Sequence, residues 1–545
     1  IRNEFIDRSY RTESSRLGFY ESQANAVYEV EDWFGEMQGV TYQQHITNLY
    51  NAVNELTKNP TSTIARSSLI QNATAFIDRS EAIYSGLKDY QVTLNTEVNN
   101  MVEKINSLGQ KIYNLNKGIV KVEAEGVERA NDLRDSRDLA LDELSKYIDI
   151  DYYETKDGEV IVSAENVPFI TKNDIAKMSV REEGTYGLLI PQWEGYQQDV
   201  YNFDKQANNA NDTDKGKLKG LLIARGVIEV NYTDIPVMPE RADYDLTTEQ
   251  GMAEYNSAMD AYQQKQDYYN KYIEPSAILS AIAGFDKLVN GIVTAMNDVL
   301  CPETTMDTTK ELTDADGNIL KAEKYVYNAS THDVLYDSHG NVVAGKENGD
   351  GTYSYEASEK LYVDANQEET ENIDSMTYKI LDMSKAGYGM DDDETRGVEL
   401  FKRNGTDRYK QITGADGSTI YVRNNLNVTG FETDYTLGNL IVNPEASQNV
   451  GTLPLSTEHG KEDFSKVNEL IDTFSKKFAS LNPENYAKAD FNTFYNDYIG
   501  EFATMGSVLT KYVNNQTTMV NGYDNQRLQT SGVSSDEELQ KMIKY

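Results

Sequence analysis

Two apolar seams with helical spacing lie at opposite ends of the chain, and they constrain its fold more than any other feature. From Ile83 to Ile119 the apolar positions follow in steps of three and four, with one four-four step around Leu94. From Phe491 to Tyr523 the alternation of four and three is unbroken, with Gln516 as the one polar residue in the series. Such steps repeat every seven residues, as in coiled-coil seams. We therefore expect two long helices, the first about 55 Å long at about 1.5 Å per residue.

Shorter amphipathic segments add to this helical frame. One runs from Phe464 to Leu481 and stops at Asn482-Pro483, and another runs from Ile278 to Leu300 and stops at Cys301-Pro302. Proline disfavours a helical residue before it, so both stops are expected helix ends. All these segments can pack as one elongated bundle built from both ends of the chain. The termini would then run side by side.

The middle of the chain has a different pattern. From about Glu311 to Asn443, short β-favouring runs such as Thr419 to Val422 are separated by glycine-containing turns. We therefore predict an α+β fold, elongated and multi-domain, in which a long antiparallel helical rod from both chain ends carries inserted β-rich outer domains. The expected parts are the N-terminal rod over 1–150, a mixed β segment over 151–230, a helical segment packing on the rod over 231–300, β-rich variable domains over 301–450, and the C-terminal rod over 451–545.

The charge balance excludes several classes of partner. The chain has 51 Lys and Arg against 89 Asp and Glu, a net charge of −38. Nucleic acids and anionic membranes are held by clustered positive charge, so we expect neither as a partner. The single cysteine, Cys301, excludes an intrachain disulfide and a cysteine-cluster zinc site.

Residues that could carry chemistry form no recognisable constellation. The four histidines include no HExxH pair, and no GxSxG elbow occurs. The segment Asp314 to Asn318 resembles a calcium loop, but its glycine stands at the fourth position rather than the sixth, so a hairpin turn is favoured. The acidic run Asp391 to Glu394 is typical of a solvated loop. We therefore predict a protein that is not an enzyme and has no catalytic residues, cofactor or metal site.

Motifs in both end regions match one known family. In chain order they are Glu4 to Arg11, Glu55 to Pro60, Ile105 to Asn116, Ala130 to Asp138, Leu141 to Ser145, Gly216 to Leu222, Arg527, and Ser531 to Ser534. With these motifs the chain resembles the family of flagellar hook-associated protein 1, the first junction protein between hook and filament. It departs at Gly226, where an acidic residue usually follows the arginine, and in an expanded stretch over 231–270. The family's terminal polymerising segments are expected to be missing, which predicts a soluble monomer.

The resemblance implies a structural subunit of the bacterial flagellum that forms the hook-filament junction by axial self-assembly. It implies as partners copies of the chain in a ring-like junction, the hook protein, the next junction protein, and a flagellar export chaperone bound through the missing C-terminus. It also implies an extracellular location, reached by the flagellar type III route without a cleavable signal peptide.

Four charged residues close together are the candidate site. Arg134, Asp135, Arg137 and Asp138 could form charge pairs between subunits, or they could form salt bridges that stabilise the rod within one chain. The sequence leaves both interpretations open.

Two alternative functions remain. One is another flagellar axial protein, either flagellin or the second junction protein, which share long end helices. The other is a surface adhesin or glycan-binding protein acting through residues 301–440. The chain has 38 tyrosines against two tryptophans, and tyrosine suits glycan binding as well as packing. Several of these tyrosines lie on the helical seams, which favours packing.

Overall fold

The computed structural model describes residues 3–35, 42–124, 129–184, 187–203, 207–308, 312, 320, 372–414, 417–424, 434–481, 483–484 and 487–531, together with short strands between 323 and 369. The helices are α1 Glu4–Phe34, α2 Tyr42–Leu56, α3 Thr63–Glu123, α4 Asn131–Tyr147, α5 Lys217–Arg225, α6 Glu249–Tyr268, α7 Ala277–Leu300, α8 Pro444–Gln448, α9 Phe464–Ser475 and α10 Phe491–Ser531. A π-helical turn, η4 Tyr269–Ile273, links α6 to α7.

The strands fall into three groups along the chain. Beside the first half of the rod lie β1 Ile150–Glu154, β2 Val160–Ala164, β3 Val167–Ile170, β4 Met178–Glu183, β5 Leu188–Trp193 and β6 Gln198–Asp199. The inserted part holds β7 Glu303–Thr308, β8 Glu323–Asn328, β9 Leu335–Tyr336, β10 Lys346–Glu347, β11 Tyr353–Ser354, β12 Tyr362–Val363, β13 Glu368–Glu369, β14 Asn372–Leu381, β15 Phe401–Arg403, β16 Tyr409–Thr413, β17 Thr419–Arg423 and β18 Leu440–Val442. Near the return to the rod lie β19 Ser456–Thr457 and β20 Lys461–Glu462.

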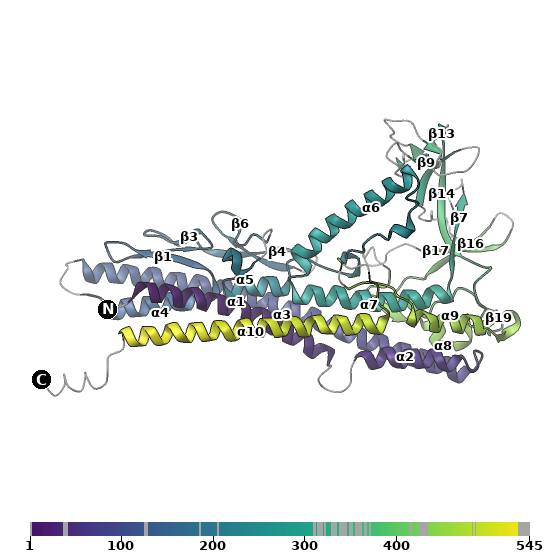
Figure 1. Cartoon of the computed structure of the whole chain (residues 1–545), viewed down its shortest axis with the longest axis horizontal. Coiled ribbons are helices and arrows are strands. Elements are labelled where there is room, and N and C mark those ends of the chain that lie inside the picture. The colour runs from purple at the N-terminus through teal and green to yellow at the C-terminus, as the bar shows by residue number, and fades with distance from the viewer. Residues whose placement is uncertain are drawn as a thin grey trace.

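The rod is formed by long helices from both parts of the chain (Figure 1). α1 and α10 run antiparallel along each other, with the start of α1 and the end of α10 at the same end of the rod. The rings of Tyr20 and Tyr512 lie 4.8 Å apart across this contact, and those of Phe34 and Tyr498 lie 5.3 Å apart. The predicted α+β architecture with paired end helices is confirmed.

The structure adds one detail to the sequence reading and corrects another. The seam from Ile83 to Ile119 lies in α3, which spans 61 residues, and its buried side faces α4, α5 and the neighbouring sheets, whereas α10 packs mainly on α1. The helix expected to reach Leu481 ends at Ser475. Here the backbones of Phe478 and Ala479 instead pair with Ala489, which holds the chain extended.

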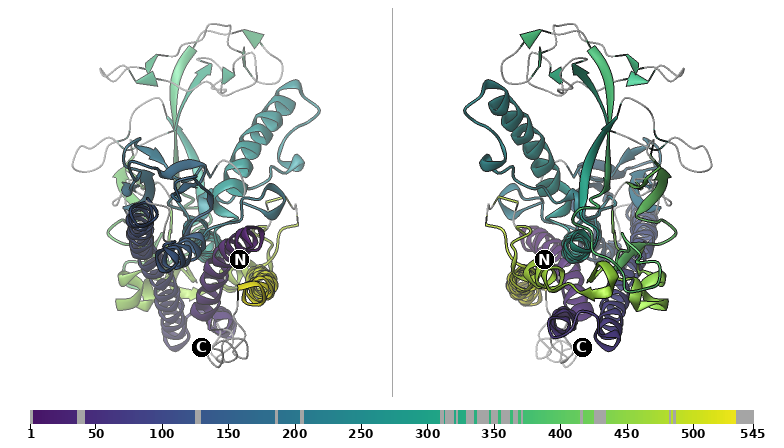
Figure 2. Two further views of the ribbon diagram at one scale, coloured as in Figure 1. Left: turned by 90° about the vertical axis from the view of Figure 1, so that its left-hand side faces the viewer. Right: turned by 90° about the vertical axis from the view of Figure 1, so that its right-hand side faces the viewer.

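Small antiparallel sheets flank the rod. β1, β2 and β3 form a meander, and β4, β5 and β6 form a second one. The meander of β1, β2 and β3 packs closely on α3. At Gly109 of α3 there is no room for a side chain, because a Cβ there would lie 2.5 Å from the Phe169 ring of β3. Farther along, β16, β17, β14, β7 and β8 form a five-stranded sheet. Figure 2 shows that this sheet and α6 rise on the same side of the helical bundle.

Helix α7 is the centre of the molecule. It is long and apolar enough to cross a membrane, but 72% of its most apolar window is buried inside the protein, as in the core helix of a globular protein. Its carboxylate Asp286 is fully buried and accepts hydrogen bonds from the backbone N–H groups of Tyr232 and Leu437, at 2.9 and 2.8 Å. Asp286 thus holds the segment at Tyr232, before α6, and the segment at Leu437, after the inserted sheet, against the same position on α7.

Two buried arginines fix the insert at its base. Arg66 of α3 is completely buried and donates to the carbonyl oxygens of Pro60, Gly451 and Leu453 at 2.8, 3.2 and 3.0 Å. Arg408 donates to Asp298 of α7 at 2.9 Å and to the Tyr435 hydroxyl at 2.8 Å. Both side chains hold segments that are distant in sequence, so the insert is attached to the rod through satisfied buried charges.

Asp286 predicts a specific dependence of stability on pH. Burial raises its pKa to about 7, above the value of about 3.9 in an unfolded chain. The folded protein therefore binds the proton of the Asp286 carboxyl more tightly than the unfolded chain does. The contribution of this proton to the free energy of unfolding is complete below about pH 4 and is lost as the pH rises through about 7. We expect the free energy of unfolding of the wild type, relative to Asp286→Asn, to fall by about 1 to 3 kcal/mol between pH 5 and 8.

Urea unfolding at several pH values measures this difference. The side-chain amide of the variant Asp286→Asn cannot titrate. It has one hydrogen-bond acceptor fewer than the carboxylate, which changes the free energy of unfolding by an amount that does not depend on pH. Asp392→Asn, at an exposed position, serves as the control and should run parallel to the wild type. Parallel curves for wild type and Asp286→Asn would contradict the prediction.

Candidate functional site

Arg134 and Arg137 lie on α4, where both engage carboxylates of the same chain. Arg134 forms a two-point contact with Glu123 at 2.7 and 2.8 Å and reaches Glu154 at 2.7 Å. Arg137 is buried and donates to Glu154 at 2.7 Å and to the carbonyl of Gly158 at 2.6 Å. The hydrogen bonds from Arg134 lower the pKa of Glu123 to about 2. Both guanidinium groups therefore join the end of α3, α4 and the β1-β2 hairpin.

The two predicted aspartates are placed differently. Asp138 lies 3.6 Å from Arg11 of α1 and is partly buried, whereas Asp135 is exposed on the outer side of α4. Arg134 and Arg137 thus share Glu154 as a partner within the chain, whereas Asp138 contacts Arg11. Contacts of these residues with other subunits stay a prediction.

A cluster that the sequence did not reveal lies at the same end of the rod. Arg527 of α10 contacts Asp7 of α1 and Asp142 of α4, each at 2.7 Å, and Arg11 contacts Asp142 at 2.7 Å. We call Asp7, Arg11, Asp142 and Arg527 the terminal clamp. Asp142 and Arg527 are 385 residues apart. Each residue lies in a motif that supports the family resemblance, but a single sequence carries no signal for their pairing.

The clamp matters because the last part of α10 is only partly covered by the rest of the rod. Between Thr510 and Thr530 no residue of α10 is buried. Phe494, Tyr495 and Tyr498, at the other end of the helix, are fully buried. A helix end without buried apolar side chains gains little from packing. The charge contacts of Arg527 therefore fix the position of the α10 end.

This half of α10 has an unusual composition. No charged residue occurs from Tyr512 to Tyr523, although 26% of the chain is charged. Tyr512 and Met519 are 46% and 42% exposed there. We call Tyr512 to Tyr523 the uncharged strip. Because charge is depleted at the centre of protein interfaces, this strip is the best candidate for contact with another protein on the rod.

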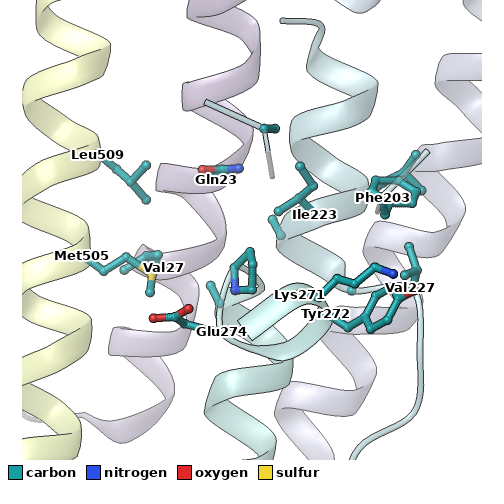
Figure 3. Close-up of a pocket in the computed structure, with 16 residues that line it drawn as sticks. Gln23, Val27, Phe203, Ile223, Val227, Lys271, Tyr272, Glu274, Met505 and Leu509 are labelled. Atoms are coloured by element: carbon teal, nitrogen blue, oxygen red, sulfur yellow. The ribbon is translucent and has the colours of Figure 1, made fainter. Parts of the chain in front are cut away.

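A hollow of about 390 Å³ opens on the side of the rod (Figure 3). Val27 of α1, Met505 and Leu509 of α10, and Ile223 of α5 give it apolar walls. Glu274, which follows the π-helical turn, also lines it, and burial raises the pKa of this carboxyl.

Reactive and metal-binding groups are sparse in the described part of the chain. No group of three or more His, Cys, Asp or Glu side chains there is arranged to hold a metal ion. Cys301 is fully buried, and burial raises the pKa of its thiol to about 12, which makes it a poor nucleophile. Asp314 to Asn318 lies outside the described residues.

Comparison with known proteins finds one family match. Residues 27–258, which run from α1 into α6 and include α3, α4 and the small flanking sheets, match the model described as the flagellar hook-associated protein FlgK helical domain. This part of the chain is a FlgK-type helical domain. The family resemblance inferred from the end motifs is therefore confirmed over this domain, and the FlgK family belongs to the extracellular flagellum.

Two individual proteins are similar to this chain. Flagellar hook-associated protein 1 of Bacillus subtilis strain 168 is 28% identical over 249 residues, which are 44% of this chain and 49% of that protein. The chain thus spans about half the length of the curated relative that it matches. The flagellar hook junction protein FlgK from Burkholderia pseudomallei has a solved structure that aligns with 96% of this chain and 100% of its own, with a TM-score of 0.49 and 12% identity.

The terminal clamp predicts how the end of α10 responds to mutation. Arg527→Gln leaves Asp7 and Asp142 without their shared partner, and we expect it to weaken local stability by about 1 to 2 kcal/mol, between the values for exposed and buried pairs. Chymotrypsin cleavage at Tyr512, Tyr523 and Leu528 should become about tenfold faster, because proteolysis follows the open population.

A matched control separates this effect from a general loss of charge. Arg181 forms an exposed pair with Asp199 at 2.8 Å, so Arg181→Gln should leave cleavage of α10 unchanged. Equal cleavage rates for Arg527→Gln and the wild type would show that the clamp does not hold the α10 end.

Proposed function

We propose that this chain is a non-enzymatic structural subunit that forms the junction between the flagellar hook and filament by axial self-assembly. The observation that carries this proposal is the match to the FlgK helical domain over residues 27–258. This match covers most of the N-terminal part of the rod, residues 1–150. The similarity to flagellar hook-associated protein 1 of Bacillus subtilis supports the same function.

In this role the rod is the part that contacts neighbouring subunits. Copies of a protein with a net charge of −38 repel one another, so close contact needs surfaces on which like charges do not face each other. The uncharged strip on α10 meets this requirement. The proposed partners are further copies of the chain in a ring-like junction, the hook protein, the next junction protein, and an export chaperone of the flagellar type III route.

The division of the chain follows from the same role. We propose that residues 1–150 and 451–545 supply the rod, that 151–230 and 231–300 pack on it, and that 301–450 form the outer domains. The buried contacts of Arg66 and Arg408 support this division, because they fasten the insert at its base and leave its far part projecting from the rod (Figure 2).

The alternative functions predict different locations. Flagellin would lie along the filament, and an adhesin acting through residues 301–440 would display that region without needing a junction. Much of 301–440 lies outside the described residues, so no observation favours the adhesin.

Immunogold electron microscopy of intact flagella tests the proposal. Antibodies raised against residues 1–545 should label one position on each flagellum, between the curved hook and the filament. Cells from which the gene is deleted provide the control for antibody specificity. Label distributed along the filament would favour flagellin, and label over the cell body without flagella would favour the adhesin; either result would overturn the junction proposal.

A further inference from the structure

A second hollow is lined by residues of α7, α9 and the start of α10. These elements lie toward the end of the rod opposite the terminal clamp (Figure 1). The hollow has a volume of about 560 Å³ and is bounded by the last turns of α7, by α9 and by the start of α10. Its floor is apolar and includes Val299 of α7, Phe478 and Phe491. The rings of Phe478 and Phe491 lie 4.7 Å apart. We call this hollow the distal cleft.

Lysines surround this apolar floor. Lys385 follows β14, Lys466 lies on α9, and Lys476 and Lys477 follow the last residue of α9. Four lysines in one cleft are notable because acidic side chains outnumber basic ones by 89 to 51 over the whole chain. The cleft is thus a local exception to the acidic charge of the protein.

The acidic groups of the cleft are already engaged. Asp298 pairs with Arg408 at 2.9 Å, and Glu469 pairs with Lys466 at 3.2 Å. Asp463 caps the start of α9 by accepting from the N–H groups of Ser465 and Lys466, both at 3.1 Å. These carboxylates therefore have their own partners and do not neutralise the remaining lysines.

Lys476 and Lys477 are the positive charges left at the rim. Both are exposed, and within the described part of the chain no carboxylate lies within ion-pair distance of either. An apolar floor with two uncompensated cations at its edge is complementary to a ligand that combines apolar side chains with carboxylates.

The size of the cleft limits the form of this ligand. An α-helix with its side chains is about 10 Å across, so 560 Å³ accommodates little more than one helical turn. A folded rod of a second copy would therefore make only a small contact here, whereas an extended segment can place alternate side chains on the floor and at the rim.

We propose that the distal cleft docks an extended acidic segment of another protein. An apolar side chain of that segment packs on Phe478 and Phe491, and its carboxylates pair with Lys476 and Lys477. This interaction is independent of the flagellar function, because it rests only on the shape and charge of the cleft.

Fluorescence anisotropy with a labelled peptide of five Glu-Leu repeats tests the proposal on the full chain. We expect saturable binding that weakens at least fivefold when NaCl is raised from 50 to 300 mM, because exposed charge pairs are screened. Lys476→Glu and Lys477→Glu should each weaken binding at least fivefold. Lys461→Glu, a charge reversal of the same size at an exposed lysine outside the cleft, should change binding less than twofold.

Further peptides and a sedimentation experiment distinguish the other outcomes. A peptide of five Glu-Ser repeats lacks apolar side chains and should bind at least fivefold more weakly, while five Lys-Leu repeats should not bind. Circular dichroism confirms that the variants are folded. Absence of binding by the Glu-Leu peptide, or equal binding by all the lysine variants, would overturn the proposal. Analytical ultracentrifugation can also overturn the proposal. If the wild-type chain self-associates and Lys476→Glu abolishes this self-association, the occupant of the distal cleft is a second copy of the chain.

Discussion

The antiparallel pairing of α1 with α10 is the contact on which the rest of the structure depends. It joins the first and last described helices of the chain, so everything between them is held as one long loop closed at its base. Closing a loop of this length has an entropic cost that grows only slowly with length. The apolar contacts of Phe34 and Tyr498, together with the terminal clamp, offset that cost at the two ends of the pair.

The inserted parts rely on buried polar contacts near this helical frame. Asp286, Arg66 and Arg408 each hold segments that are far apart in sequence, and each is almost fully buried. A buried charge is tolerated only where hydrogen bonds satisfy it. These side chains therefore fix where the insert leaves and rejoins the rod.

Much of the fold could be predicted from local patterns. The seam from Phe491 to Tyr523 predicted a long helix, and α10 contains it, because seven-residue spacing is a local property. The partner of α10 could not be predicted in this way, because α1 has a mixed surface in which Asp7, Arg11 and Glu13 are buried among polar neighbours. The early end of α9 was missed because the competing extended pairing of Phe478 with Ala489 is not local. Arg134 could be selected from the sequence because charged residues lie next to it in the chain. Its partners Glu123 and Glu154 could not be predicted, because these contacts are not local in sequence.

Native-state hydrogen exchange over a series of urea concentrations tests the central claim most directly. If the pairing of α1 with α10 closes the rod, the amides of Phe19 to Phe34 and those of Phe494 to Leu509 should exchange with the same opening free energy. The dependence of that free energy on urea concentration should also be the same for both groups, because neither helix can keep its buried face without the other. The contrary result would be opening of Phe494 to Leu509 at a markedly lower free energy while Phe19 to Phe34 stay protected.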